Sequence, residues 1–589
     1  KEILEVIDPI PVINEELLEL SEWLSETTFC TLFDAISVVL PKPYPKRLPK
    51  LAVYEKNINI ESIVLSQEQN EVFETITVDN ISKCYLLHGV TGSGKTSVFK
   101  HLINYYLNQG KTAMLLVPEI ALTPQMLKQF TALFGETVAV LHSGLTNSQR
   151  AVEYRNIEEG KKNIVIGTRS AVFAPLENIG IIIIDEEQEH TYKSESAPRY
   201  HTTDVAKHRC KTHNAKLLLA SATPSLESFY YANKGIYTLL TLEKRYGDVS
   251  LPMVQVVDMS YEEPDFSRLL LEELQKNIRN GEQSILLLNR RGYHTMIMCA
   301  HCNQPIYCKD CSLPMTFHKQ TNKLLCHFCG FTREMPPQCP ACGYNVLKKI
   351  GMGTQKLEEK LQTLLPNARI LRMDADTITS KQTYEISFEA FRNKEYDIML
   401  GTQMLGKGLD FPNVTLVGII SVDKSLYYGD YKAYERTFSL ITQVIGRSGR
   451  AHKKGRAVLQ TFLPEHYVIQ LGSQQNYKAF AVNELTLRRT LLMPPYCDIC
   501  TVTFISDNDN KTFTVADMIF THICERIKEI KPLKIFPPTR DNYYLKGGKY
   551  YWHIMMKCKN NAEFRAFLKD IIKNKDYKGV TVTIDFNGG

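Results

Sequence analysis

The sequence has no apolar run long enough to cross a membrane and no signal-peptide pattern at its start. Its longest apolar stretches, 179–184 and 414–422, fall far short of the roughly 18 residues that a spanning helix needs. A strong charge of either sign is also missing, because 70 Lys and Arg offset 64 Asp and Glu to a net charge of +6. With 44% hydrophobic and 23% charged residues, wholesale disorder and fibrous repeats are excluded. We therefore expect a globular protein without a membrane partner.

The length of 589 residues suggests several domains, since one domain usually takes about 150 residues. The chain begins with Lys rather than Met, which leaves open a natural segment ahead of it. Its charge is uneven, because residues 501–589 carry 15 basic and 10 acidic residues, a net charge of +5. Two interpretations stay open for this region: an ordinary solvated surface, or a patch that faces nucleic acid or an acidic peptide.

Short apolar, β-branched runs alternate with longer helical segments from Leu65 onward. Because the runs are continuously apolar, they indicate strands buried on both faces of a parallel sheet. The pattern stops and restarts, which predicts two α/β units, the second interrupted by a cysteine-rich segment. The expected strands are 86–88, 113–117, 138–142, 164–167, 181–184 and 217–220 in the first unit, and 284–288, 369–373, 398–401, 415–421 and 457–461 in the second.

The N-terminal region is expected to have a strand-like start and a helix over 15–28. Three prolines follow at 41, 43 and 45, and a fourth at 49. Proline cannot continue a helix or a central strand, so we expect a linker or domain boundary here.

The run Gly-Val-Thr-Gly-Ser-Gly-Lys-Thr at 89–96 fits the phosphate-loop pattern without a mismatch. It follows an expected strand and opens a helix, so main-chain N–H groups can wrap a phosphate at the helix N-terminus. Lys95 is expected to reach the β- and γ-phosphates of ATP, and Thr96 to ligate Mg²⁺. The nucleotide-binding prediction covers Gly89, Gly92, Gly94, Lys95 and Thr96.

A second Mg²⁺ anchor is expected where the apolar run 181–184 ends in Asp185-Glu186-Glu187. A buried strand would bring these acids to the carboxyl edge of the sheet, where ligands bind in such folds. Asp185 is predicted to hold the Mg²⁺ shell, and Glu186 to orient or deprotonate the attacking water.

The run 443–450, Gln-Val-Ile-Gly-Arg-Ser-Gly-Arg, places Arg447 and Arg450 three residues apart, on one face of a helix. A planar guanidinium can stabilise charge on the γ-phosphate oxygens, so both arginines are candidate catalytic residues. A purely structural arginine pair is the alternative.

Eight of the 15 cysteines lie within 44 residues, as four Cys-x-x-Cys pairs. Each pair can place two thiolates on one tetrahedral ion, so eight thiolates predict two structural Cys₄ zinc sites. Free cysteines, disulfides and iron–sulfur ligation are less favoured by four regular pairs. The predicted ligands are Cys299, Cys302, Cys308, Cys311, Cys326, Cys329, Cys339 and Cys342.

Nested pairing of these cysteines is favoured over sequential pairing. Inner pairs separated by 14 residues can form a hairpin-like ribbon around one zinc, and the outer pairs then meet when the ribbon folds back. Cys497 and Cys500 also match Cys-x-x-Cys, but without a second pair nearby we expect buried thiols.

Together with the motifs above, further short sequence blocks resemble those of a known protein family. Pro118-Glu119, Gly167-Thr-Arg-Ser170, Ser221-Ala-Thr-Pro224 and Gly401-Thr-Gln403 resemble superfamily 2 helicases. Residues 289–293 (Asn-Arg-Arg-Gly-Tyr) directly before the cysteine pairs, 198–201 (Pro-Arg-Tyr-His) and 141–145 (Leu-His-Ser-Gly-Leu) resemble the PriA family of replication-restart helicases. The likeness runs through the whole chain and is densest over 65–463.

This resemblance implies an α/β protein with two RecA-like lobes, a cysteine-rich two-zinc insertion and an α+β C-terminal domain. It implies an ATP-dependent 3′→5′ DNA helicase that recognises stalled replication forks, initiates primosome assembly and uses ATP, Mg²⁺ and two Zn²⁺. Implied partners are forked and single-stranded DNA, the tail of single-stranded-DNA-binding protein, and primosome and replicative-helicase loading proteins, in the bacterial cytoplasm at the nucleoid. Gln69 matches the position that contacts adenine in the family, and Gln443 is also predicted to bind the nucleotide.

For DNA, the resemblance implies backbone-phosphate contacts at 167–169 and 401–403 and an aromatic-rich loop over 187–201. Tyr192, Tyr200 and Arg199 would supply stacking and phosphate binding in that loop; a plain surface crossover is the alternative. The stretch 546–552 mixes cations with aromatics, which suits DNA or an acidic apolar tail. Lys546 and Trp552 are the expected contacts, with a core Trp as the alternative.

Three departures from the family pattern stand out. Gln188 occupies the position where the family usually has His, so it can form hydrogen bonds but cannot titrate. Asp585-Phe586 replaces the usual Asp-Pro. The stretch between the first 40 residues and Leu65 has too few residues for the winged helix of the family. Either the protein lacks this module or this chain omits segments.

The expected domains are an N-terminal DNA-binding remnant with its linker, helicase lobe 1, two parts of lobe 2 around the zinc insertion, and a C-terminal domain. The domain boundaries, in the same order, are 1–48, 49–245, 246–295 and 347–465 for the two parts of lobe 2, 296–346 for the insertion between them, and 466–589.

Two other functions remain open: a superfamily 2 translocase without fork specificity, and a non-enzymatic fork-binding assembly factor.

Overall fold

The computed structural model describes residues 13–40, 55–79, 81, 83–119, 124–245, 252–262, 265–288, 295–299, 301–302, 304–309, 314–318, 323–326, 331–350, 354–373, 381–402, 411–420, 422–426, 430–449, 454–527, 530, 534–573, 577, 579–588. The chain divides into two compact units, Lys1–Tyr246 and Gly247–Gly589. The expected strand-like start and the proline-rich linker lie outside the described residues.

The first unit is built on a seven-stranded parallel sheet with the strand order β3-β4-β2-β5-β6-β1-β7. The six strands expected from continuous apolar runs are all present. The seventh, at the edge, was not expected because its residues are only partly buried. The strands are β1 (Cys84–Gly89), β2 (Thr112–Leu116), β3 (Val138–Leu141), β4 (Ile164–Gly167), β5 (Ile179–Asp185), β6 (Lys216–Ser221) and β7 (Thr238–Leu242).

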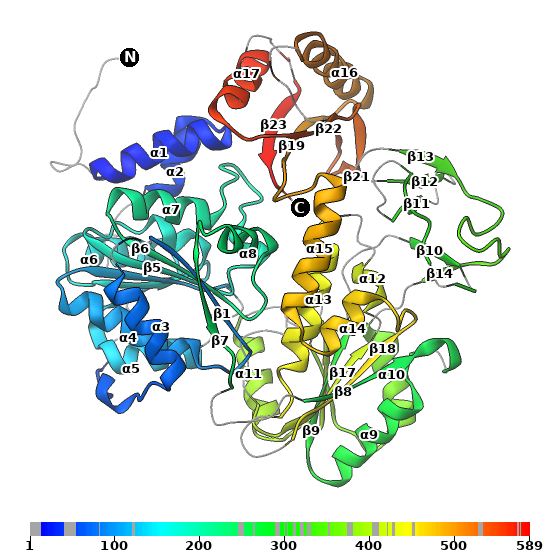
Figure 1. Ribbon diagram of the computed structural model, residues 1–589, viewed down its shortest axis with the longest axis horizontal. Helices are drawn as coiled ribbons and strands as arrows, with labels where there is room; N and C mark the ends of the chain where they lie inside the picture. The colour runs from blue at the N-terminus through cyan, green and yellow to red at the C-terminus, as the bar shows by residue number, and fades with distance from the viewer. Residues whose placement is uncertain are drawn as a thin grey trace. The chain divides into compact units, whose positions relative to one another are not determined.

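Helices cover both faces of this sheet (Figure 1). Helices α3, α4 and α5 share one apolar core with alternate residues of the central strands, and α7 and α8 lie on the opposite face. The helices are α3 (Gln67–Val78), α4 (Lys95–Asn108), α5 (Pro124–Phe134), α6 (Asn147–Glu158), α7 (Thr202–Thr212) and α8 (Leu226–Asn233), with short 3₁₀ turns η1 (Ile60–Ser62), η2 (Gly135–Thr137), η3 (Arg169–Phe173) and η4 (His190–Tyr192).

Two N-terminal helices belong to the same compact unit as this sheet. The expected helix is α1 (Glu15–Thr28), and Asn14 caps it by accepting a hydrogen bond from the N–H of Leu17. A second helix, α2 (Leu32–Val39), follows and begins with a capping box between Thr31 and Asp34. It was not expected, although a Thr followed three residues later by an acid is a helix-start signal.

The second unit contains a six-stranded parallel sheet in the order β15-β16-β9-β17-β18-β8. Helices α9 and α10 pack their leucines on one face. All five expected strands are present, joined by β8 at the edge. The elements are β8 (Met253–Asp258), η5 (Met259–Tyr261), α9 (Arg268–Arg279), β9 (Gln283–Leu288), α10 (Thr354–Leu364), β15 (Ile370–Met373), α11 (Lys381–Arg392), β16 (Ile398–Gly401), β17 (Val414–Ile420), α12 (Asp423–Leu426), α13 (Ala433–Ile445), β18 (Arg456–Thr461), α14 (Tyr467–Ser473) and α15 (Tyr477–Leu491).

The cysteine-rich insertion forms a five-stranded antiparallel sheet between β9 and α10. Its β11–β12 hairpin is the ribbon expected between the inner cysteine pairs. The pairing of β10 with β14 brings the start and the end of the insertion together. The strands are β10 (Thr295–Cys299), β11 (Thr316–His318), β12 (Lys323–Leu325), β13 (Thr332–Glu334) and β14 (Leu347–Ile350).

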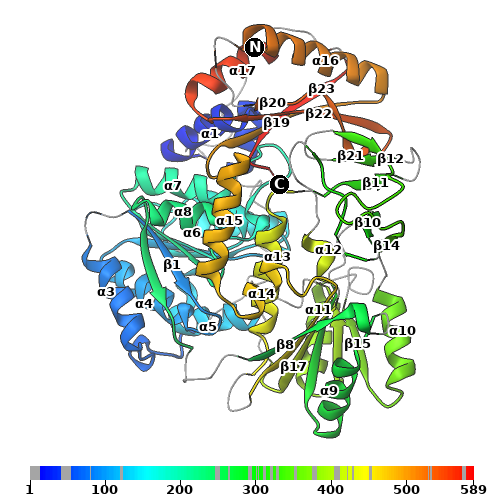
Figure 2. The same cartoon turned by 45° about the vertical axis from the view of Figure 1, so that its right-hand side comes forward.

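The C-terminal domain is an antiparallel sheet with helices α16 and α17 on one side (Figure 2). An apolar cluster that includes Ile297, Phe317, Ile499 and Met555 joins the cysteine-rich insertion to this domain. Of the helices that the structure describes, none has the length and apolarity needed to cross a membrane. The elements are β19 (Asp498–Ser506), α16 (Asp509–Arg526), β20 (Lys534–Ile535), β21 (Thr539–Lys546), β22 (Lys549–Cys558), α17 (Ala562–Lys573) and β23 (Thr581–Phe586).

Candidate active site and metal centre

The glycine-rich loop at 89–96 lies between the end of β1 and the start of α4. Gly92 and Gly94 adopt φ values of 83° and 79°, the left-handed region that only glycine enters without strain. Lys95 is the first residue of α4, and its Nζ donates to the carbonyl of Gly89 at 2.8 Å. The loop thus folds back over the helix N-terminus.

The loop has the features that an anionic phosphate needs. No side chain caps the N-terminus of α4, so main-chain N–H groups there remain available. The hydroxyl of Ser93 is buried and has no hydrogen-bond partner among the described residues. A Cβ at Gly89 would come within 2.7 Å of that hydroxyl. These donors and the Lys95 ammonium fit a polyphosphate.

Gln69 lies on α3 and is buried beside the loop. Its Nε2 donates to the carbonyl of Ser93 at 2.8 Å, and its Oε1 accepts from the N–H of Ser66 as part of a capping box. Gln69 therefore braces the phosphate loop in this structure, while its expected adenine contact stays a prediction.

Asp185 ends β5 and Glu186 follows it at the carboxyl edge of the sheet. Burial and the neighbouring Glu186 carboxylate raise the pKa of Asp185 to about 7, although Lys95 acts in the opposite direction. Glu186 has a φ of 48°, which is strained for a residue with a side chain. Two adjacent carboxylates near a lysine fit a divalent cation, whose charge would favour the ionised form of Asp185.

Gln188 links the acidic motif to the Ser221-Ala-Thr223 segment after β6. Its Nε2 donates to Glu186 Oε2 at 2.8 Å, and its Oε1 accepts from the hydroxyl of Ser221 at 2.5 Å. The Ser221 hydroxyl also accepts from the N–H of Thr223 at 2.8 Å. This bridge lies within the first unit and fixes the Glu186 carboxylate. The sequence could have indicated the partner, because Ser221 belongs to a motif already noted.

The loop 187–201 does not present its tyrosines as expected. Tyr192 is 0% exposed, and its hydroxyl lies 3.0 Å from the Leu116 carbonyl and 2.7 Å from the Asp185 carbonyl. Tyr200 is buried against Phe173. In this structure neither ring can stack on a base, so that expectation is wrong here. The aromatic residues of a loop sequence do not reveal whether their rings will be buried in the core.

Arg169 also contacts this loop, because its Nη1 donates to the carbonyls of Thr191 and Lys193 at 3.2 and 2.7 Å. Thr168, the other side chain expected at DNA phosphates, is buried. The loop and the segment after β4 are therefore joined by direct bonds.

In the second unit, α13 ends at Ile445, so Arg447 lies in the turn beyond it rather than on a helical face. Gly446 closes the helix and starts that turn. Gln443 lies within α13 and is buried. Arg450 and Gln403 lie outside the described residues, so the expected arginine pair is described only in part.

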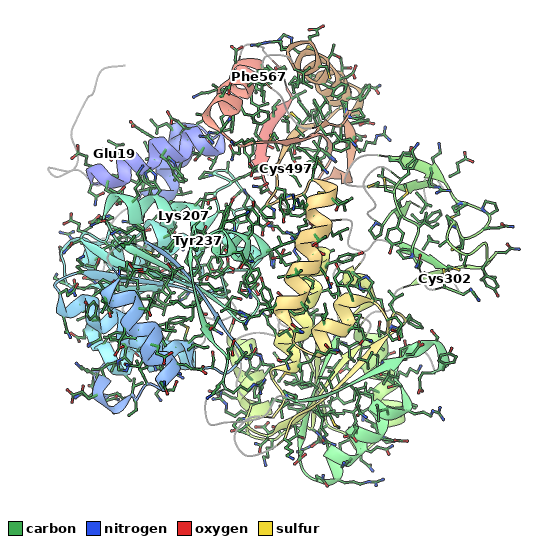
Figure 3. The ribbon with its side chains drawn as sticks, viewed as in Figure 1. Glu19, Lys207, Tyr237, Cys302, Cys497 and Phe567 are labelled. Carbon is green, nitrogen blue, oxygen red and sulfur yellow. The ribbon has the colours of Figure 1, made fainter. Side chains whose placement is uncertain are left out.

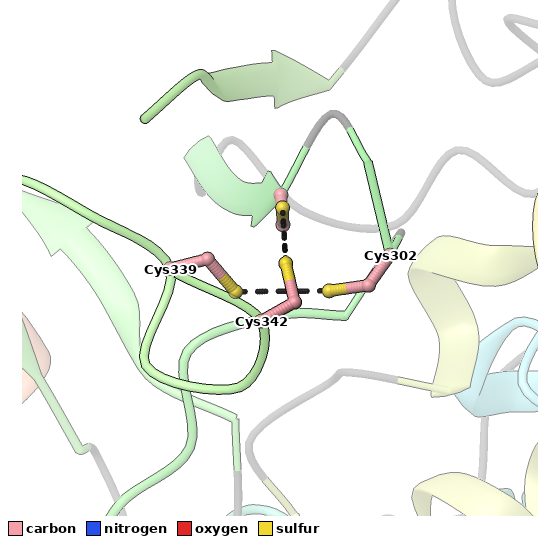
Figure 4. Close-up of side chains that lie close together, drawn as sticks. Cys302, Cys339 and Cys342 are labelled. Carbon is pink, nitrogen blue, oxygen red and sulfur yellow. Dashed lines mark hydrogen bonds between the residues drawn. The ribbon is translucent and has the colours of Figure 1, made fainter. Parts of the chain in front are cut away.

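Four of the eight clustered cysteines come together in one group (Figure 4). Their sulfur atoms all lie within 4.8 Å of one another. The Sγ atoms of Cys299 and Cys342 are 3.5 Å apart, and those of Cys302 and Cys339 are 3.6 Å apart. This is the outer set of the nested arrangement, and its geometry suits one tetrahedral metal ion.

Electrostatics within this group favour the thiolate form of Cys299, whereas burial raises the pKa of Cys302 to about 12. The main-chain N–H of His301 lies 3.4 Å from the sulfur of Cys299. Burial alone would raise the pKa of Cys299, but main-chain N–H groups of Cys302 and His301 lower it to about 7. A thiolate is the form that ligates zinc.

Of the inner set, Cys308 and Cys326 are buried in the cluster shared with the C-terminal domain, while Cys311 and Cys329 lie outside the described residues. Cys497 (Figure 3) and Cys500 are buried, and burial raises the pKa of both thiols. This agrees with the expectation of buried thiols there.

Trp552 lies on β22, with its ring 4.7 Å from Phe513 and the guanidinium of Arg540 5.2 Å above it. Its Nε1 donates to Asp509 at 2.7 Å. The ring is half-buried, so its exposure does not decide between a core Trp and a Trp that contacts a ligand at the surface. The side chain of Lys546 lies outside the described residues.

Comparison with known proteins gives the family. The chain is 42% identical over 539 residues to the replication restart protein PriA of Bacillus subtilis, covering 90% of this chain and 67% of that protein. The PriA of Treponema pallidum is 38% identical over 87% of this chain and 78% of its own length, and that of Rickettsia felis is 34% identical over 97% and 89%. The chain belongs to the PriA family.

Family models divide this chain further. Residues 66–230 match the DEAD/DEAH box helicase model and 348–452 the helicase conserved C-terminal domain. Residues 308–333 match the PriA DNA helicase Cys-rich region, and 1–41 the 3′ DNA-binding domain. The protein is thus an ATP-dependent DNA helicase of replication restart, with two RecA-like lobes and a cysteine-rich insertion. Among solved structures, RecG bound to a three-way DNA junction aligns at 17% identity over 81% of this chain and 56% of that one, with a TM-score of 0.43.

Proposed function

We propose that this protein recognises stalled replication forks, unwinds DNA with 3′→5′ polarity and initiates primosome assembly. The observation that carries the proposal is the juxtaposition of an intact phosphate loop with the Asp185–Glu186 pair in a helicase lobe. A protein that only binds forks would not need Lys95 at a helix N-terminus or a carboxylate fixed by Gln188.

Within this function, Lys95 and the glycines at 89, 92 and 94 bind the phosphates of ATP, while Thr96 and Asp185 hold Mg²⁺. Glu186 orients the attacking water, because the hydrogen bond from Gln188 fixes its carboxylate beside Asp185. Gln69 and Gln443 contact the nucleotide, and Arg447 and Arg450 stabilise charge on the γ-phosphate.

Two zinc ions with nested pairing stabilise the insertion. Cys299, Cys302, Cys339 and Cys342 would hold one ion, as the distances among their sulfurs support. Cys308, Cys311, Cys326 and Cys329 would hold the other, at the ends of the β11–β12 hairpin. Four thiolates leave no open position, so these ions serve structure and strand separation rather than chemistry.

DNA phosphates are gripped at 167–169 and 401–403, without reading base identity. The C-terminal domain binds the acidic tail of single-stranded-DNA-binding protein near Trp552 and Lys546, and the protein passes forks to the replicative-helicase loader at the bacterial nucleoid. The supporting observation is the cation–aromatic stack of Arg540 on Trp552 in a region of net positive charge. The domain division is the one expected above, with lobe 1 over 49–245 and the insertion over 296–346.

Fork specificity is tested by comparing three duplexes of equal length: a fork, a linear duplex with a 3′ single-stranded tail, and one with a 5′ tail. The expected order of unwinding rates is fork, then 3′ tail, with no unwinding of the 5′ tail. The Lys95→Ala variant is the control for ATP dependence. Equal rates on the fork and the linear 3′-tailed duplex would instead indicate a translocase without fork specificity.

A further inference from the structure

A buried arginine on α7 joins three separate parts of the first unit. Arg209 is 0% exposed, and its Nε and Nη2 each donate to a carboxylate oxygen of Glu16 on α1 at 2.9 Å. Its Nη1 donates to the carbonyls of Val172 and Ala174 at 2.8 Å each, and Nη2 also donates to the carbonyl of Leu176 at 3.3 Å. Every N–H of the guanidinium therefore has an acceptor, in the planar geometry that a lysine cannot reproduce.

The three carbonyls belong to the segment that follows 167–169, one of the proposed grips on DNA phosphates. Ala174 and Leu176 are buried, and they follow η3 rather than lying in the sheet. Buried carbonyls outside a sheet or helix need other donors. Arg209 supplies them, while Arg169 fixes the start of the same segment to the carbonyls of Thr191 and Lys193.

The other side of the arginine is the N-terminal helix α1. Trp23 of α1 stacks on His208 of α7, with ring centroids 4.5 Å apart. Burial alone would raise the pKa of Glu16, but His213 and Arg209 lower it to about 2, so its charge persists near neutral pH. The region that matches the 3′ DNA-binding domain model is thus attached to the motor lobe by a bidentate ion pair.

We propose that Glu16 and Arg209 are positioning residues for DNA binding by the motor lobe. Glu16 orients the Arg209 guanidinium, and Arg209 holds the carbonyls at 172–176, so the segment beginning at 167 keeps the shape in which it grips a DNA backbone. The N-terminal helix acts as a brace for this grip, apart from any contact of its own with DNA. The inference rests on the proposed grip at 167–169.

The test is DNA-stimulated ATP hydrolysis of the full chain, titrated with single-stranded DNA at saturating ATP. Glu16→Gln keeps the shape of the side chain but removes the charge that orients Arg209. It is expected to raise the half-saturating DNA concentration about fivefold, the effect of losing roughly one hydrogen-bond's free energy. The maximal rate and the half-saturating ATP concentration should stay within about twofold of wild type, because the ATP site is untouched.

Glu19→Gln is the matched control, since Glu19 is exposed on the same helix (Figure 3) and its loss removes the same charge. Arg209→Lys is the second variant: it keeps the positive charge but cannot serve the carboxylate and three carbonyls together. It should also raise the half-saturating DNA concentration, whether or not Glu16→Gln proves stable in thermal melting.

Arg169→Ala separates this inference from the proposed grip. If Arg169→Ala weakens DNA activation but Arg209→Lys and Glu16→Gln match Glu19→Gln, the positioning role is wrong and the grip stands. A Glu16→Gln variant that lowers the maximal rate with DNA half-saturation unchanged also overturns the positioning role. If Arg169→Ala leaves DNA activation unchanged, the grip itself is wrong, and the positioning role falls with it.

Discussion

At the scale of single residues, the proposed ATP site contains two neighbouring acids with different surroundings. Asp185 is half-buried at the strand end, while Glu186 receives a hydrogen bond from Gln188. The sequence identified both acids, because an apolar strand ending in acids beside a phosphate loop is a specific pattern. It could not reveal that Glu186 would take a strained backbone conformation or that Ser221 would complete its support.

The raised pKa of Asp185 predicts a pH-dependent need for Mg²⁺. Burial and Glu186 raise this pKa from 3.8 to about 7, so below pH 7 the carboxyl is increasingly protonated and cannot ligate a cation. The Mg²⁺ concentration that half-saturates ATP hydrolysis should rise about fivefold between pH 7 and pH 6, and about tenfold between pH 8 and pH 6. Titrating Mg²⁺ at pH 8, 7 and 6 measures this. Equal half-saturation at all three values would show that Asp185 is not the metal anchor.

Gln188 is predicted to contribute to hydrolysis through Glu186. Gln188→Ala removes the donor to Glu186 and the acceptor for Ser221, and should lower the maximal rate about tenfold, equivalent to one hydrogen bond to a charged group. Gln188→His should restore the rate at pH 8 but lose it toward pH 5.5, because a protonated imidazole cannot accept from the Ser221 hydroxyl. A pH profile of Gln188→His that matches wild type would contradict this role.

At the scale of elements, continuous apolar runs predicted both central sheets because parallel strands are buried on both faces. The edge strands β7 and β8 were missed because edge positions are partly exposed and do not give such runs. Helix α2 was missed although its capping box was readable. The burial of Tyr192 could not be predicted, since it depends on packing that leaves no local pattern. The end of α13 before Arg447 was missed although Gly446 is a helix-end signal.

The cysteine-rich insertion gives a prediction that separates nested from sequential pairing. With nested pairing, Cys299 and Cys342 ligate the same ion, so the double variant Cys299→Ser/Cys342→Ser should lose one of two zinc ions per chain. With sequential pairing the same change would damage both sites. Zinc content by atomic absorption decides, and Cys497→Ser is the control because its buried thiol lies outside the cluster.

At the scale of the whole molecule, two compact units contain the parts of a helicase motor, and the relatives show the PriA family over nearly all of this chain. The sequence predicted this architecture because its motifs occur in a fixed order around an insertion of four cysteine pairs. The central claim is that ATP bound at 89–96 and 185–186 powers activity on forked DNA.

The most direct test is ATP turnover with and without forked DNA, in wild type and in Lys95→Ala. Wild type should hydrolyse ATP slowly alone and at least about tenfold faster with forked DNA, as expected when DNA completes a transition-state site. Lys95→Ala should lose the stimulated rate while still binding the fork, because Lys95 lies in the phosphate loop. Full DNA-stimulated turnover by Lys95→Ala, or no stimulation of wild type, would contradict the account.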